Sequence, residues 1–337
     1  MERSSSLRLL TDSPSFRAAL GIPRDAPLDL RPLAQGEYHK NYVFRHPISS
    51  ERMVLRVNYG SQMHLAHQIE YEYQALQALA RSGRTPVPLY VDGSRTVFPQ
   101  GILVMKYLPG RPLDYGRDME EAARALADVH STPVADPSFL VTEPSPIRGI
   151  LKECREMFSR YQCSPYKDAG TEARIIRMLG EADRRAADLT DGTWQSVLIN
   201  TELNNRNFIV DGQGKVSVID WEKPLWGDPA QDLGHMLAPT TSFWKTDRIL
   251  GFREADQFAD QYIEAVNGRV RLGRFRERLR IFLQVTCMRG ITWCAMAWDE
   301  YMRPGRALRN EETFEKLKAY LSDDFLDIIE DYMLRDE

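Results

Sequence analysis

The most informative part of the sequence reads Ile199-Asn-Thr-Glu-Leu-Asn-Asn-Arg-Asn207 and continues, after a turn, as Val218-Ile-Asp-Trp-Glu222. Between them lies Asp211-Gly-Gln-Gly214, which is typical of a hairpin turn. A hairpin folds the chain back on itself, so Asn207 and Asp220 are expected to lie close together. Amide and carboxylate oxygens are ligands that Mg²⁺ prefers. This pair is therefore predicted to hold magnesium.

Glu202 lies five residues before Asn207 in the same Asn-rich loop and could supply a further carboxylate near the cleft. The loop also has a second interpretation, because Asn and Asp are common in ordinary turns, where they bond their own backbone. The loop by itself fits both a functional site and an ordinary turn, and other segments of the chain are needed to distinguish the two.

The composition is that of an ordinary globular protein. The chain has 337 residues, 43% of them hydrophobic, and 44 Lys and Arg against 48 Asp and Glu give a net charge of −4. This length allows two domains, or one fold with two lobes. Phosphate backbones are bound by clustered Lys and Arg, so a slightly acidic chain is not expected to bind nucleic acid.

Cysteine usage and hydropathy indicate the compartment. The cysteines form no CxxC pair, which favours reduced thiols over a zinc site or a disulfide framework. Met1–Phe16 holds no apolar core of signal-peptide length. No run of about 18 apolar residues could span a membrane. We therefore expect a cytoplasmic protein without a membrane partner, and the sequence leaves its oligomeric state open. The cysteines are Cys154, Cys163, Cys287 and Cys294.

The chain changes character near residue 105, from β-rich runs to helical periodicity. This predicts an α+β fold with a small β-rich N-lobe (1–104), a hinge (105–110) and a larger, mostly helical C-lobe (111–337). We expect the ligand in the cleft between the lobes. The predicted strands are 42–44, 53–57, 101–108, 195–210 and 215–220, and the predicted helices are 65–80, 120–130, 147–161, 171–188 and from 256 onward.

Taken together, these segments resemble the aminoglycoside phosphotransferase and choline kinase superfamily, which has a bilobal protein-kinase-like fold. That family carries a loop H-G-D-x-x-x-x-N, a hairpin with I-D-[WF], and then G-D-P-x-x-D-L. Here the corresponding residues are 200–207, 219–221 and 227–233. The second and third segments match closely. The loop departs at two positions, with Asn200 in place of the His and Glu202 in place of the catalytic Asp.

The resemblance also implies a nucleotide site. The stretch 35–43, with its single glycine Gly36, corresponds to the loop that covers the phosphates. Arg56 stands where the family has the strand lysine that pairs with the α- and β-phosphates, and Glu72 corresponds to the helix glutamate that orients this cation. Arginine can bind phosphate with two nitrogens, but its geometry differs from that of lysine.

The other expected contacts follow from the same resemblance. Backbone groups near Lys106 and Leu108 in the hinge would contact the adenine. The implied cofactors are ATP and Mg²⁺, with the ion held by Asn207 and Asp220.

The implied function is ATP- and Mg²⁺-dependent phosphate transfer to a hydroxyl of a small molecule, with Glu202 as the catalytic residue that orients this hydroxyl. Glutamate keeps the charge of the family's aspartate and has a similar ordinary pKa, but its carboxylate extends one methylene further. Two alternatives stay open. One is a nucleotide-binding pseudokinase with a sensing or scaffolding role, and the other is nucleotidyl transfer in the same cleft.

The acceptor is a small hydroxyl-bearing compound, aminoglycoside-, choline- or sugar-like. Aromatic side chains of the C-lobe could surround a quaternary ammonium, whereas acidic side chains would favour an aminoglycoside. The aromatic candidates are Trp244, Trp293, Trp298 and Tyr301, and the acidic candidates are Glu222, Asp228, Asp299 and Glu300.

Overall fold

The computed structural model describes residues 2–187, 193–304 and 310–334. Contacts divide the chain into two compact units, each of which is described by itself. Unit 1 consists of Met1–Val141 and Arg206–Leu225, and unit 2 of Thr142–Asn205 and Trp226–Glu337. The first part of unit 1 thus extends past the predicted hinge. The lobe boundaries at 104 and 110 stay a prediction.

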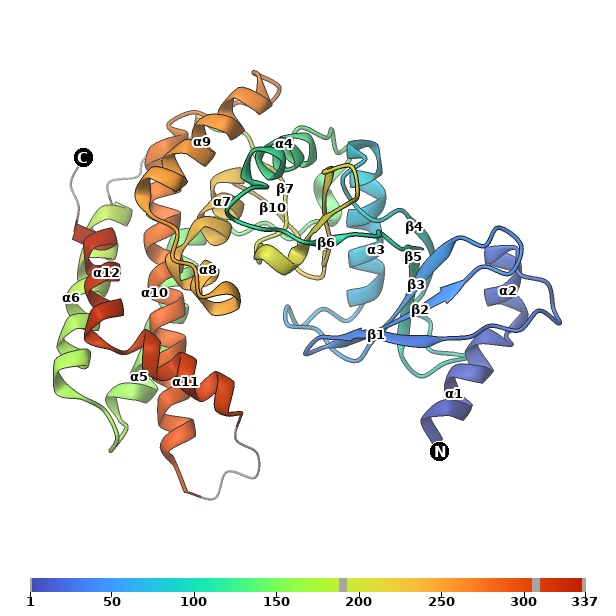
Figure 1. Cartoon of the computed structure of the whole chain (residues 1–337), viewed down its shortest axis with the longest axis horizontal. Helices are drawn as coiled ribbons and strands as arrows, with labels where there is room; N and C mark the ends of the chain where they lie inside the picture. The colour runs from blue at the N-terminus through green and yellow to red at the C-terminus, as the bar shows by residue number, and fades with distance from the viewer. Residues whose placement is uncertain (1, 188–192, 305–309, 335–337) are drawn as a thin grey trace. The chain divides into compact units, whose positions relative to one another are not determined.

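Unit 1 is built on a five-stranded antiparallel sheet with the strand order β1-β2-β3-β5-β4 (Figure 1). The central strand β3 is buried at every position after its first residue, and this includes the polar residues Arg56 and Asn58. Helix α3 (Gln68–Leu79) packs on β4 and β5. The strands are β1 (Arg31–Gln35), β2 (His39–Arg45), β3 (Arg52–Asn58), β4 (Pro88–Asp92) and β5 (Gly101–Lys106).

Two helices precede this sheet, α1 (Glu2–Thr11) and α2 (Pro14–Leu20), and the sequence pattern does not predict them. They are held by the core, because Leu10 and Phe16 belong to the same buried cluster as Leu55 of β3. The strands β1 and β4 are also not predicted. Each contains a proline, which weakens a strand pattern but is tolerated at a sheet edge, where both strands lie.

A second small sheet in unit 1 contains the predicted hairpin. Its strand order is β6-β8-β9, and Phe208 of β8 pairs with Val218 of β9. The Asp211 amide donates to the Lys215 carbonyl and closes the turn between them. The hairpin is therefore confirmed. Its strands are β6 (Arg111–Pro112), β8 (Phe208–Val210) and β9 (Val216–Val218), and helix α4 (Met119–His130) packs on β9.

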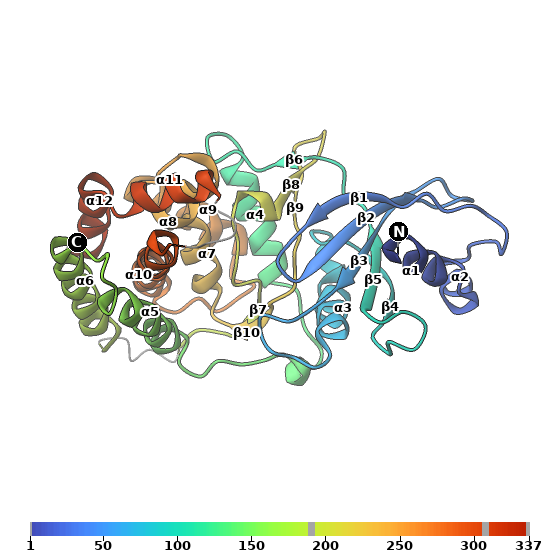
Figure 2. The ribbon, with the colours of Figure 1, turned by 90° about the horizontal axis from the view of Figure 1, so that it is seen from below.

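Unit 2 is mostly helical and is organised around the long helix α10, which contacts α5, α6, α7, α8, α11 and α12 (Figures 1 and 2). Helix α10 buries residues around its whole circumference, as expected for a helix in the centre of a bundle. The elements are α5 (Pro146–Gln162), α6 (Ala169–Ala187), β7 (Val197–Ile199), β10 (Leu225–Gly227), α7 (Pro229–Leu237), α8 (Pro239–Thr246), α9 (Phe252–Val266), α10 (Phe275–Met302), α11 (Glu311–Tyr320) and α12 (Asp323–Leu334).

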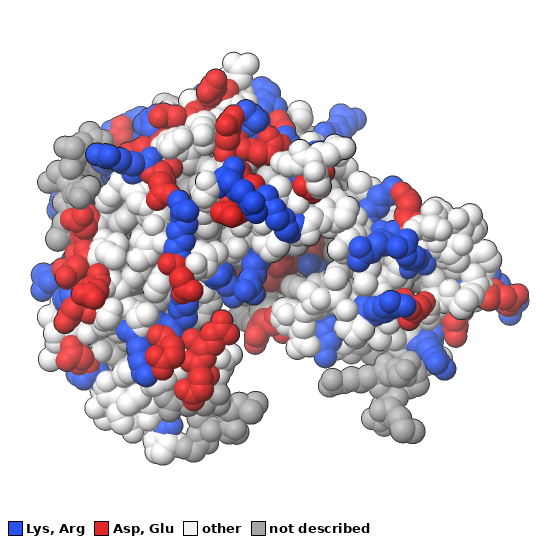
Figure 3. All heavy atoms as spheres, in the orientation of Figure 1, with Lys and Arg blue, Asp and Glu red and all other residues white. Residues whose placement is uncertain are grey.

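This combination of a sheet-based unit and a helical unit confirms the predicted α+β fold class. Acidic and basic side chains are interspersed over the face drawn in Figure 3. Within the described residues, no helix is both long enough and apolar enough to cross a membrane.

The contact between α7 and α10 depends on a glycine. A Cβ built on Gly234 of α7 would lie 2.5 Å from the Cβ of Phe282 and 2.9 Å from the Phe282 carbonyl carbon on α10. The backbone of α10 cannot give way as a flexible side chain could. Gly234 therefore allows the two helices to approach closely.

We expect Gly234→Ala to lower the free energy of unfolding by about 1–3 kcal/mol, the usual cost of overpacking a core. The matched control is Gly180→Ala in α6, where nothing lies within 4 Å of the new Cβ. There the same change should raise stability by about 0.5–1 kcal/mol, because alanine is the better helix former. Urea denaturation of both variants measures the difference, and equal effects at the two sites would contradict the close contact.

Candidate active site

A buried arginine forms the centre of the candidate site in unit 1. Arg56 on β3 is 5% exposed, and its Nε donates to Oδ1 of Asn41 on the neighbouring strand β2, at 3.1 Å. Its Nη1 lies 2.5 Å from Oε1 of Glu72 on α3 and 3.1 Å from Oδ1 of Asp220. The fold thus brings together three residues that the sequence analysis singled out: Arg56, Glu72 and Asp220.

The electrostatics of this group depend on all three charges. Burial lowers the pKa of Arg56, but the charges of Glu72 and then Asp220 outweigh burial and raise it above its ordinary value. Burial also raises the pKa of Glu72, against the opposing attraction of Arg56. A buried ion pair that loses one partner leaves an uncompensated charge, which is strongly destabilising. The guanidinium therefore stays charged, and its position depends on the two carboxylates.

The hairpin in unit 1 places Asn207 beside the turn that carries Asp220. The Ile219 amide donates to the Asn207 carbonyl at 2.8 Å, so the residue before Asp220 is bonded directly to Asn207. Asp220 itself has a φ of +65°, in the left-handed region, so the backbone no longer has the extended conformation of strand β9. Trp221 is buried, and its indole donates to the Val218 carbonyl at 3.0 Å. An amide and a carboxylate at such a turn fit a hard cation such as Mg²⁺.

His39, the first residue of β2, is a residue that the sequence analysis missed. The Gly36 amide donates to the His39 carbonyl at 3.0 Å, and a Cβ on Gly36 would lie 2.8 Å from the His39 ring. The ring is therefore packed directly against the glycine. Its Nδ1 lies 2.9 Å from Oε2 of Glu222. Local patterns give no signal for this contact, because the two residues are 183 positions apart.

The hinge-like stretch in unit 1 is held by two strands. The Lys106 amide donates to the Val87 carbonyl at 2.9 Å, and the Tyr107 amide to the Arg52 carbonyl at 3.1 Å. The Lys106 side chain lies at the surface, 2.9 Å from Glu51. Leu108 follows directly after these bonds. The Lys106 amide is therefore already bonded within unit 1, and the adenine contact expected from the backbone near Lys106 and Leu108 stays a prediction.

In unit 2, the turn that carries Glu202 is held by one buried carboxylate. Asp232 of α7 is fully buried, and its two oxygens accept the amides of Asn200 at 2.8 Å and Thr201 at 2.6 Å. The Asn200 side chain accepts the Glu202 amide at 3.2 Å. Thr201 has a φ of +76°, which is strained for a β-branched residue. It stands where the H-G-D loop has its glycine, and this is a third departure from the family pattern.

The carboxylate of Glu202 faces a cation on α10. Nη2 of Arg289 lies 4.0 Å from Oε1 of Glu202, and the same guanidinium forms an ion pair with Glu153 on α5, at 3.0 Å. His235 of α7 is close by, and its Nδ1 lies 2.8 Å from the Leu203 carbonyl. Burial lowers the pKa of His235, and the Arg289 charge lowers it further. The turn that carries Glu202 is therefore held by hydrogen bonds to the imidazole of His235 and to the buried carboxylate of Asp232.

Two of the predicted acidic acceptor residues turn out to be structural. Asp228 is 2% exposed and binds Nε of Arg278 at 2.6 Å, while Asp299 is paired with Arg303. A carboxylate that already neutralises a guanidinium is less suited to bind a cationic substrate, so these two pairs count against the acidic hypothesis without testing it. Glu222 lies in unit 1 beside His39, as described above.

The aromatic candidates fall into separate ring pairs in unit 2. Trp244 and Trp293 meet edge to face, with centroids 5.3 Å apart. Trp298 and Tyr301 instead both stack on Phe314. The four rings are therefore divided between two packing groups. A cage for a quaternary ammonium that uses all four side chains does not fit this arrangement.

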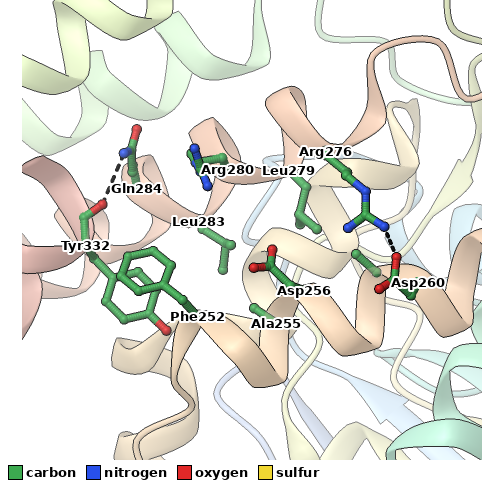
Figure 4. Close-up of a pocket in the computed structure, with 11 residues that line it drawn as sticks. Phe252, Ala255, Asp256, Asp260, Arg276, Leu279, Arg280, Leu283, Gln284 and Tyr332 are labelled. Carbon is green, nitrogen blue, oxygen red and sulfur yellow. Dashed lines mark hydrogen bonds and ion pairs between the residues drawn. The ribbon is translucent and has the colours of Figure 1, made fainter. Parts of the chain in front are cut away.

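The helical unit also holds a cavity of about 360 Å³ between α9, α10 and α12. Figure 4 shows the ion pair of Arg276 with Asp260 at one end of it and the bond from Gln284 to the Tyr332 carbonyl at the other. Its described lining residues include none of the predicted site residues. This cavity is therefore distinct from the candidate active site.

Comparison with known proteins defines the family. The family model described as "Phosphotransferase enzyme family" matches residues 29–275, and the chain therefore belongs to this family. Viomycin phosphotransferase from Streptomyces vinaceus is 29% identical over 172 residues, which cover 48% of this chain and 58% of that protein. The chain thus aligns with little more than half the length of this relative.

Solved structures show the same fold. A spectinomycin phosphotransferase, crystallised with ADP and spectinomycin, superimposes with a TM-score of 0.65 at 14% identity, covering 97% of this chain and 98% of that one. Choline kinase LicA from Streptococcus pneumoniae gives a TM-score of 0.56 at 16% identity, covering 89% and 93%. The predicted bilobal protein-kinase-like fold is therefore confirmed.

We expect Asp232→Asn to lower the free energy of unfolding by about 1–3 kcal/mol, because the asparagine amide group would face one of two buried backbone donors and leave it without an acceptor. The matched control is Asp183→Asn, which removes one surface charge paired with Arg155 and should change stability by less than about 1 kcal/mol. Denaturant unfolding of the two variants gives the comparison. A similar small effect at both positions would show that Asp232 does not hold the turn.

The depressed pKa of His235 predicts a pH effect of known sign. The unfolded chain takes up a proton near the ordinary value of 6.5, whereas the folded state resists it, so folding stability is lost as the pH falls below about 6.5. His235→Asn keeps a donor for the Leu203 carbonyl and removes the titration. We expect the variant to lose less stability than the wild type between pH 7 and pH 5 in thermal melts. Parallel losses in both proteins would contradict this role.

Proposed function

We propose that this chain transfers the terminal phosphate of ATP, in the presence of Mg²⁺, to a hydroxyl group of a small molecule. The observation that carries the proposal is the buried Arg56 with its two carboxylates, Glu72 and Asp220. Phosphoryl transfer requires positioning and charge neutralisation rather than covalent chemistry by the protein. Membership in the phosphotransferase enzyme family and the ADP complex of one structural neighbour support it.

Arginine suits this position because it has several donors. Nε and Nη1 of Arg56 are engaged by Asn41, Glu72 and Asp220, and within the described part of the chain Nη2 has no partner. A lysine has a single nitrogen for the same tasks. Arg56 would therefore keep its bond to Glu72 while Nη2 binds an α- or β-phosphate oxygen. The loop of residues 35–43, with Gly36, would cover these phosphates, and the backbone at Lys106 and Leu108 would contact the adenine.

Asn207 and Asp220 would hold the magnesium ion, which neutralises phosphate charge when bound. Glu202 would accept a hydrogen bond from the acceptor hydroxyl and take up its proton as the phosphate is transferred. Its carboxylate extends one methylene further than that of the family's aspartate, and the turn that carries it departs from the family pattern at Asn200 and Thr201 as well. We infer that the turn has adapted as a unit to the longer side chain.

The acceptor belongs to the aminoglycoside-, choline- or sugar-like class of hydroxyl compounds. The names of similar proteins supply the first compounds to test, which are viomycin, spectinomycin and choline. The ion pairs of Asp228 and Asp299 and the divided aromatic rings argue against a recognition site made from those side chains. The guanidinium of Arg289 lies 4.0 Å from the carboxylate of Glu202, the proposed catalytic group.

We expect Glu202→Gln to lower turnover by about 10²–10⁴-fold, the usual contribution of a positioned acid–base group, while the thermal shift caused by Mg·ATP persists. Asp220→Asn should reduce the turnover and also the thermal shift caused by Mg·ATP, because it removes a proposed metal ligand. Glu156→Gln, at an exposed site on α5, is the matched control and should leave both unchanged. Labelled ATP with viomycin, spectinomycin, choline and a sugar panel provides the assay.

The other outcomes separate the alternatives. A Mg·ATP shift without any phosphorylated product would favour the pseudokinase, and an AMP-labelled product would favour nucleotidyl transfer. Absence of any shift at millimolar Mg·ATP would contradict nucleotide binding altogether, since a ligand that prefers the folded state must stabilise it.

A further inference from the structure

Three side chains with metal-binding atoms meet in unit 1. His39 from the start of β2, and Asp220 and Glu222 from the segment after β9, each offer one ligand atom, and these atoms lie within 4.8 Å of one another. Nδ1 of His39 is 2.9 Å from Oε2 of Glu222, while Nε2 is 3.9 Å from Oδ1 of Asp220. The imidazole thus faces a different carboxylate with each of its nitrogens.

The two distances have different meanings. The 2.9 Å contact is a hydrogen bond, in which Nδ1–H donates to Glu222. The 3.9 Å separation between Nε2 and Asp220 is too long for a hydrogen bond. It is nevertheless shorter than the roughly 4.2 Å that two metal–ligand bonds of about 2.1 Å can span. An ion between Nε2 and Asp220 therefore needs only a small adjustment of the side chains.

The imidazole is oriented before any ion binds. The His39 side chain is 6% exposed and packs against Gly36, where a Cβ would lie 2.8 Å from the ring. The bond from Nδ1–H to Glu222 keeps the proton on Nδ1 and leaves the lone pair of Nε2 for a ligand. A carboxylate that holds the far nitrogen of a histidine is the common arrangement behind metal-binding imidazoles.

The local charge also favours a divalent cation. Glu72, Asp220 and Glu222 contribute three carboxylates, and Arg56 contributes one guanidinium. With the imidazole counted as neutral, these side chains carry a formal charge of −2. A bound divalent ion would balance this charge, although it would share the Asp220 carboxylate with Arg56.

We propose that His39 is a metal ligand of this chain, which binds an ion through Nε2 together with Asp220 while Glu222 orients the ring. The proposal concerns the metal of the proposed nucleotide site, and it rests on the proposed function only for what the ion does there. Mg²⁺ prefers oxygen ligands, whereas imidazole suits later divalent metals such as Co²⁺ and Zn²⁺ and is accepted by Mn²⁺. The site should therefore select Mn²⁺ or Co²⁺ over Mg²⁺ even without nucleotide.

The test is calorimetric titration of tag-free, full-length protein with MnCl₂, CoCl₂ or MgCl₂ in the absence of ATP. We expect Mn²⁺ and Co²⁺ to bind more tightly than Mg²⁺. His39→Phe keeps a ring against Gly36 and removes both nitrogens, so it should weaken Mn²⁺ and Co²⁺ binding by about 10²-fold and leave Mg²⁺ nearly unchanged. The matched control is His67→Phe, at an 81% exposed position of unit 1, which should alter no affinity.

A spectroscopic measurement gives an independent readout. The visible absorption of bound Co²⁺ changes when a nitrogen ligand is lost, so the spectrum of His39→Phe should differ from that of the wild type and His67→Phe. If His39→Phe fails to fold in a thermal melt, the smaller His39→Asn replaces it. Equal Mn²⁺ affinity in the wild type and the His39 variant, or equal wild-type affinity for Mn²⁺ and Mg²⁺, would overturn the proposal.

These results are separable from those on phosphate transfer. Metal binding that depends on His39, in a protein that phosphorylates no acceptor, would support the histidine ligand and contradict the proposed function. Mg²⁺-dependent turnover, in a protein whose Mn²⁺ affinity is the same with and without His39, would support the proposed function and contradict the histidine ligand.

Discussion

Burying a guanidinium in a β-sheet is costly unless nearby carboxylates neutralise it, and at Arg56 this need is met by two distant segments of unit 1. Glu72 reaches it from α3 and Asp220 from the turn after β9, so one cation holds together a strand, a helix and a distant hairpin. None of these charges could be buried alone at acceptable cost. Among the described residues, this network engages Nε and Nη1 of Arg56, and the phosphate contact proposed above uses Nη2.

In unit 2, a buried carboxylate stabilises a strained backbone conformation. The turn before Glu202 contains a threonine with a positive φ, a conformation that a glycine adopts without strain and a β-branched residue does not. Two hydrogen bonds to the buried Asp232 hold this conformation. Strained residues persist where the surrounding structure over-determines them, often at functional sites. The turn that carries Glu202 is therefore held by hydrogen bonds to a buried side chain.

Local signals in the sequence predicted much of the fold. The Asp-Gly turn at Asp211 predicted the hairpin, and apolar periodicity predicted α3, which begins a few residues later than expected. Asp299 in the last turn of α10 pairs with Arg303, the residue directly after the end of this helix, so this contact is local in the sequence. The helices α1 and α2 and the edge strands could not, because they are short and are stabilised by packing on the sheet.

The fold class, the hairpin between Asn207 and Asp220 and the family resemblance could be predicted from the sequence. All of these depend on residues close together in the chain or on motifs in a fixed order. The pairing of distant charges became visible only in the folded structure. His39 bonds to Glu222 across 183 residues, and Asp228 pairs with Arg278 across 50. Such contacts arise from the packing of whole helices and strands. The residues next to a side chain in the sequence do not indicate a partner that comes from another element.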